Sequence, residues 1–187
     1  MNKVMLFAAG ISTLDVLLFL ALPGGQLVLD LGRVGQQPLM LLAFPFVHFD
    51  VMHLAENVVG LMVTAILAFE LDVNVKWFAL AFAAGVAAAI PLSAAFHGEA
   101  VAGSSTGIFA TLGVVLQKAK AYVTPFITVP LFIVFMFAQS AASWLSCAGC
   151  AIGPFKTGVF HFGGFAVGGI TQLAPKPAAK RMIREVN

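Results

Sequence analysis

Charged residues are scarce in this sequence. Only 10% of its 187 residues are charged, whereas a typical soluble domain carries about 25%. The few basic residues form no stripe, and the formal net charge is only +2, which argues against a nucleic-acid partner. Hydrophobic residues make up 60% of the chain, too many for intrinsic disorder or for the interior of a soluble domain of this size. The composition therefore predicts a protein whose main solvent is the lipid bilayer.

Cysteine is also rare, with Cys147 and Cys150 forming a single C-A-G-C sequence. A structural zinc site needs four ligands, and the chain has no second cysteine pair. We therefore expect no metal ion and no other cofactor. Two interpretations of the pair remain open. The favoured one is two small apolar residues in a glycine-containing bend, and the other is a redox pair, or a disulfide in an oxidising compartment.

Long apolar segments are abundant, and a bilayer core of about 30 Å needs about 20 apolar residues of helix. We predict an all-α polytopic membrane protein with one domain over residues 1–187, six spans and a polar tail at 175–187. The spans are expected at roughly 4–22, 51–69, 77–95, 105–117, 124–146 and 157–174. Asp15 and the lack of a small-residue cleavage site argue that the first is a retained helix and not a signal peptide.

The fourth segment is too short to cross a bilayer fully, because it would rise only about 20 Å at about 1.5 Å per residue. We therefore expect its helix to begin below one membrane surface. The non-helical backbone before it must then be sheltered by protein or face a water-filled cavity.

The basic residues predict the orientation. If the N-terminus is inside, eight of the ten lie on the cytoplasmic side, and only Arg33 and Lys156 lie outside. We therefore expect an integral protein of a prokaryotic inner membrane with both termini in the cytoplasm. The second, fourth and sixth helices would then enter from the outer face.

Polar groups within a bilayer are costly, so each is a functional candidate. His53 and Asn57 are four residues apart near the outer start of the second helix, and Gly103-Ser104-Ser105 opens the fourth. His161 lies about one turn into the sixth helix. The topology thus predicts a hydroxyl, an imidazole and an amide at a similar depth beneath the outer surface.

This combination is typical of acyl transfer. Serine becomes a nucleophile when a base, usually histidine, accepts its proton. The N–H groups of a helix N-terminus and an asparagine amide are suitable donors to an oxyanion. Glycines along the sixth helix would let it approach the fourth closely, although each polar residue taken alone could simply mediate helix contacts.

Over about residues 38–170 the chain resembles the rhomboid intramembrane serine proteases. The family's paired histidines and asparagine fall on His48, His53 and Asn57, and its G-x-S motif falls on Gly103-Ser104-Ser105. The other matching positions are the aromatic four residues after the serine, the glycine eight residues after it, and the histidine of the sixth helix with glycines three and seven residues later: Phe109, Gly113, His161, Gly164 and Gly168.

The resemblance implies a six-helix rhomboid-like bundle that cleaves transmembrane protein substrates near the outer membrane face. Ser105 and His161 would form the catalytic dyad, and the Ser105 N–H, His53 and Asn57 would hold the oxyanion. A close variant is a specialised relative that processes a C-terminal sorting helix. The alternative is a rhomboid-like pseudoprotease that binds transmembrane helices without cleaving them, which Thr106 favours because it stands where the family usually has glycine.

Overall fold

The computed structural model describes residues 2–22, 26–96, 100–120, 122 and 153–171. Regular structure in these residues is entirely helical, apart from one antiparallel bridge between Leu29 and Val101. The helices are α1 (Lys3–Ala21), α2 (Met40–Ala43), the 3₁₀ helix η1 (Phe44–Phe46), α3 (Val51–Glu70), α4 (Val75–Ala95), α5 (Ser105–Ala119) and α7 (Gly153–Thr171).

The predicted all-helical fold is confirmed, and the helices α1, α3, α4, α5 and α7 overlap five of the six segments predicted as spans. The predicted helix at 124–146, the tail at 175–187, Cys147 and Cys150 lie outside the described residues. Within the described part of the chain, α1, α3 and α4 are long and apolar enough to cross a membrane. The short helices α2 and η1 were not predicted, because they lie in a stretch too short to be recognised as a span.

Three of the long helices begin at a polar side chain that caps them. The side-chain oxygens of Asn2, Asp50 and Asn74 accept hydrogen bonds of 2.8 Å from the backbone N–H groups of Val4, His53 and Lys76. Such caps satisfy N–H groups that have no partner within the helix. The cap at Asn74 explains why α4 begins two residues before the predicted boundary at 77.

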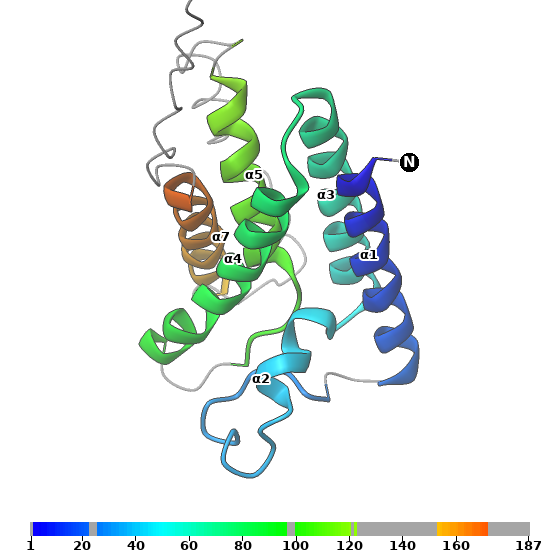
Figure 1. Cartoon of the computed structure of the whole chain (residues 1–187). Helices are drawn as coiled ribbons and strands as arrows, with labels where there is room; N and C mark the ends of the chain where they lie inside the picture. The colour runs from blue at the N-terminus through cyan, green and yellow to red at the C-terminus, as the bar shows by residue number, and fades with distance from the viewer. Residues whose placement is uncertain (1, 23–25, 97–99, 121, 123–152, 172–187) are drawn as a thin grey trace, which may run out of the picture.

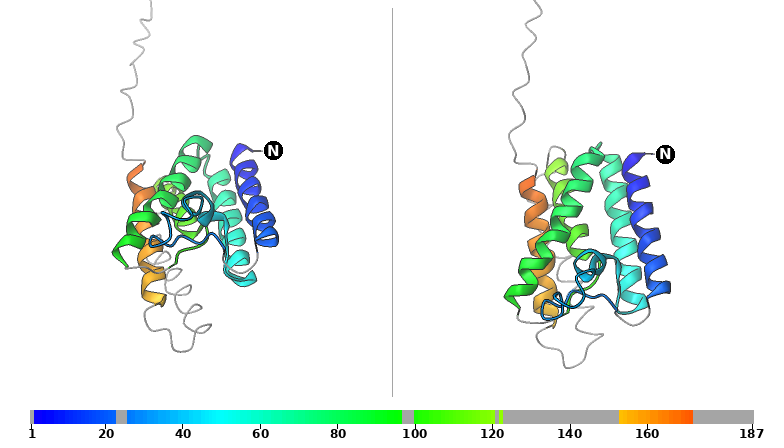
Figure 2. Two further views of the ribbon diagram at one scale, coloured as in Figure 1. Left: turned by 90° about the horizontal axis from the view of Figure 1, so that it is seen from below. Right: turned by 60° about the horizontal axis from the view of Figure 1, so that its bottom comes forward.

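The helices form two groups that meet along α5 (Figure 1). Helix α1 packs on α3, while α4 and α7 pack on α5 and on each other, and α5 also contacts α3. Helices α3, α5 and α7 begin at the end of the bundle where α2 lies, and the N-terminus lies at the opposite end (Figure 2). The N-terminal turns of three helices therefore share one end of the molecule.

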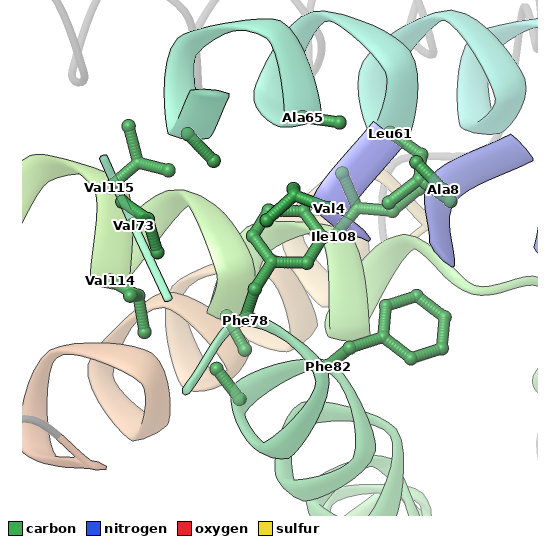
Figure 3. Close-up of a cluster of buried hydrophobic side chains, with 13 residues drawn as sticks. Val4, Ala8, Leu61, Ala65, Val73, Phe78, Phe82, Ile108, Val114 and Val115 are labelled. Atoms are coloured by element: carbon green, nitrogen blue, oxygen red, sulfur yellow. The ribbon is translucent and has the colours of Figure 1, made fainter. Parts of the chain in front are cut away.

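The largest buried cluster joins α1, α3, α4 and α5 (Figure 3). Its buried members are Val4, Ala8, Leu61, Ala65, Ala68, Val73, Phe78, Ala81, Phe82, Ile108, Ala110, Val114 and Val115. Many are small, which lets helices approach closely where the surrounding lipid is as apolar as the side chains. Large apolar side chains such as Leu17, Leu20 and Val59 point outward and are exposed, as expected for faces that meet lipid.

Candidate active site

The chain enters α5 through a buried, non-helical segment. The N–H of Val101 donates to the carbonyl oxygen of Leu29 at 2.9 Å, and the N–H of Gly103 donates to the carbonyl oxygen of Phe44 at 2.9 Å. Ala102, Gly103 and Ser104 are all buried. This agrees with the expectation that backbone before the short fourth helix is sheltered by protein.

Gly103 has a left-handed backbone conformation, with φ at +88°, which glycine adopts at little cost. It is also closely surrounded. A Cβ at this position would lie 2.7 Å from Nδ2 of Asn57 and 2.8 Å from Nε2 of His53. Only glycine therefore lets the turn before α5 lie directly against these two side chains of α3.

Asn57 is 4% exposed, and among the described residues its Nδ2 has no hydrogen-bond partner. Burying an amide donor without an acceptor is costly, so such a group in a folded protein asks for an explanation. Because this amide lies beside Gly103, its N–H groups are close to the start of α5. The Asn57 amide is therefore suited to donate a hydrogen bond to an acceptor on a bound molecule.

His48 lies outside the long helices, and its ring contacts that of His53. The two rings meet edge to face, with centroids 5.0 Å apart. Burial, reinforced by the neighbouring His53, lowers the pKa of His48 to about 4, so its ring is neutral at neutral pH. Phe49 also stacks on His53, with ring centroids 6.1 Å apart. His53 therefore contacts two aromatic rings.

His161 is buried in α7 and stacks on Phe109 of α5, with ring centroids 4.1 Å apart and ring planes 16° apart. Phe109 follows Ser105 by four residues, so the two share one face of α5. The stack therefore holds the imidazole against the residue that lies about one helical turn after Ser105. Although both residues are described, no hydrogen bond joins Ser105 to His161.

Three predicted glycines lie where α5 and α7 almost touch. A Cβ on Gly164 would collide with the carbonyl oxygen of Thr106, and one on Gly168 with that of Ala110. A Cβ on Gly113 would collide with the carbonyl oxygen of Phe165. Any larger residue would push the helices apart and move His161 away from α5.

Thr106, the residue after Ser105, is 3% exposed. A Cβ on Gly164 would lie 3.1 Å from its side-chain Cγ2 atom. The threonine side chain therefore packs against α7 at one of the close contacts of the helix pair.

Two neighbouring serines have different surroundings. Ser105 is the first residue of α5 and is half-buried. Ser104 is fully buried, and its hydroxyl donates to Oδ2 of Asp15 in α1 at 3.4 Å. Asp15 was not among the predicted site residues, although an acidic residue within an apolar span is a signal of a functional position.

The N-terminus of α5 keeps free donors. The carbonyl oxygen of Ser104 accepts the first helical hydrogen bond, from the N–H of Ile108 at 3.0 Å. Within the described ranges, no acceptor is found for the N–H groups of Ser105 and Thr106. These donors follow Gly103, which lies against Asn57 and His53, and they suit the binding of an oxygen that carries negative charge. The described residues contain no cluster of His, Cys, Asp or Glu suited to a metal ion.

Fold and site together define a helical membrane protein whose serine, histidine and asparagine side chains converge at one end of the bundle. The family model of the Rhomboid domain matches residues 35–174. The chain therefore belongs to the rhomboid family, whose members are usually intramembrane proteases. It has no significant match among curated proteins or among solved structures.

Proposed function

We propose that this protein is an intramembrane serine endopeptidase that cleaves transmembrane protein substrates near the outer membrane face. The observation that carries the proposal is the convergence of α3, α5 and α7 on the Gly103–Ser105 turn. Asn57 and His53 lie against Gly103, and His161 is held on Phe109 one turn from Ser105. Family membership supports the same class of activity.

In the proposed reaction, the Ser105 hydroxyl attacks the carbonyl carbon of the scissile peptide bond while His161 accepts its proton. The N–H of Ser105 and the amide of Asn57 donate to the oxygen that becomes negatively charged, with His53 beside them. His161 then returns the proton to the leaving amine, and water hydrolyses the acyl-enzyme. The dyad's hydrogen bond would form in the substrate complex, since such bonds are often long in free enzymes.

No carboxylate is needed to orient His161 in this scheme, because the Phe109 stack and the close α5–α7 contact already restrict its ring. A restricted imidazole loses little freedom when it accepts the proton of Ser105 in the reaction. The aromatic residue therefore has a positioning role in the proposal.

The most direct test is labelling with a fluorophosphonate probe, which reacts with activated serine hydroxyls. We expect the purified wild-type protein to label, and Ser105→Ala to lose the label completely. Mass spectrometry of the labelled peptide should find the phosphonyl group on Ser105. Ser104→Ala serves as the matched control, since it removes the adjacent hydroxyl and should leave the label on Ser105.

The second candidate is a rhomboid-like pseudoprotease that binds transmembrane helices without cleaving them. Two observations favour it: Thr106 follows the serine, and no hydrogen bond joins Ser105 to His161, both of which the structure describes. If the wild-type protein binds transmembrane helices but does not react with the fluorophosphonate, the pseudoprotease is favoured over the protease. Cross-linking of Ser105→Ala to single-span membrane proteins identifies substrates or bound helices in either case.

We further propose that both termini are cytoplasmic and that the polar site opens toward the outer face. Exposed Asn2 lies at the N-terminal end, and exposed Gln36 lies in the loop beside α2 at the other end. In protein with Cys147 and Cys150 replaced by alanine, a membrane-impermeant maleimide should label Gln36→Cys in intact spheroplasts. Asn2→Cys should label only after permeabilisation, and the reverse pattern would contradict this orientation.

A further inference from the structure

Asp15 is the fully buried acidic residue of α1, and its position connects this helix with the start of α5. Its exposed fraction is 0%, and its Oδ2 accepts the hydrogen bond from the Ser104 hydroxyl. Among the described residues its other oxygen, Oδ1, has no partner. An acidic side chain within a membrane helix is expensive and usually functional. The contact spans 89 positions of sequence, so local helix formation does not explain it.

Ser104 occupies the N-cap position of α5 without capping the helix. Serine at an N-cap normally has extended backbone angles and accepts a hydrogen bond from the N–H two or three residues ahead. Here φ is −85° and ψ is 3°, and the side chain makes no capping hydrogen bond. Asn2, Asp50 and Asn74 cap their helices in the usual way. The Ser104 hydroxyl therefore donates to Asp15 and accepts no hydrogen bond from the first turn of α5.

We propose that Asp15 is a positioning residue for the proposed protease reaction, holding Ser104 out of the N-cap conformation so that the first turn of α5 can serve the oxyanion. Without this carboxyl group, Ser104 would rotate toward extended ψ and accept from the N–H of Thr106 or Gly107. That rotation would move Gly103 relative to Ser105, and so separate the Asn57 amide from the Ser105 N–H. The inference rests on the proposed function, because the oxyanion donors acquire a role only in that reaction.

The experiment compares rates of fluorophosphonate labelling and thermal unfolding of purified variants. Asp15→Ala should slow labelling of Ser105 by roughly 10- to 100-fold, because misplacement by about 1 Å has effects of that size. Asp15→Asn keeps an oxygen that accepts from Ser104 and should label close to the wild-type rate. Ser12→Ala is the matched control, because this hydroxyl is also buried on α1 but has no partner among the described residues.

The double variant Asp15→Ala/Ser104→Ala separates positioning from packing. Alanine is a poor N-cap, so removing the Ser104 hydroxyl should restore part of the rate lost in Asp15→Ala. If Asp15 only fills space, the double variant will label as slowly as Asp15→Ala or more slowly, and the proposal is overturned. Folded Asp15→Ala that labels at the wild-type rate also overturns it.

Two further outcomes keep this inference distinct from the proposed function. If the wild-type protein does not react with the fluorophosphonate, the proposed protease activity is rejected, and the proposed role of Asp15 is rejected with it. If the wild-type protein is labelled and the Asp15 variants are labelled at the same rate, only the proposed role of Asp15 is rejected. If Asp15→Ala does not fold, Asp15→Val takes its place in the same comparison, since valine also accepts no hydrogen bond and leaves less empty space.

Discussion

Ser105→Ala and His161→Ala are each expected to abolish proteolysis, with losses of roughly 10⁴–10⁶-fold in kcat. Removing the hydroxyl takes away the group that forms the acyl-enzyme, and removing the imidazole takes away its base. Because the two act as one unit, the double variant should lose little more than either single variant. The measurement is cleavage, in detergent, of a single-span protein identified by cross-linking to Ser105→Ala.

Folding of these variants must be checked, since His161 is buried against Phe109. We expect thermal unfolding of Ser105→Ala to match the wild type, because the half-buried Ser105 hydroxyl makes no hydrogen bond with His161, although both residues are described. If Ser105→Ala cleaves the substrate at a rate comparable with the wild type, Ser105 is not the nucleophile. Ser104 would be the next candidate, although it is buried and its hydroxyl donates to Asp15.

Asn57→Ala is expected to lower kcat by about 10²–10³-fold, or roughly 2.7–4 kcal/mol, with KM nearly unchanged. The amide would contact the substrate oxygen mainly in the transition state, so its loss affects turnover more than binding. Its Nδ2 has no partner among the described residues. Removing the amide therefore breaks no hydrogen bond from that nitrogen in the free protein, and the midpoint of thermal unfolding should change little.

His53→Ala provides the comparison from the same helix. It should cost less activity than Asn57→Ala if the Ser105 N–H and the Asn57 amide already hold the oxyanion. It should cost more stability, because His53 makes ring contacts with both His48 and Phe49. An Asn57→Ala protein that unfolds earlier but cleaves at the wild-type rate while folded would remove Asn57 from the mechanism.

Much of this arrangement could be predicted from the sequence. The apolar segments indicated α1, α3, α4, α5 and α7 because spanning a bilayer sets the length and composition of a helix. The spacing of Gly164 and Gly168 after His161 indicated a close helix pair, because residues at these intervals share one helical face. The structure agrees, since both glycines lie against backbone carbonyl oxygens of α5.

The sequence by itself determined which residues are polar within an apolar chain, and therefore which few positions can do chemistry there. Only the tertiary structure decided that Asp15 meets Ser104, that Gly103 adopts a positive φ, and that the Asn57 amide lies buried beside it. The physical reason is that α1 is apolar on nearly every side, so its sequence carries no periodic pattern to indicate the buried face. The rotation of such a helix is set by close packing against its neighbours, and that packing brings a carboxyl group of the first helix to the turn before Ser105.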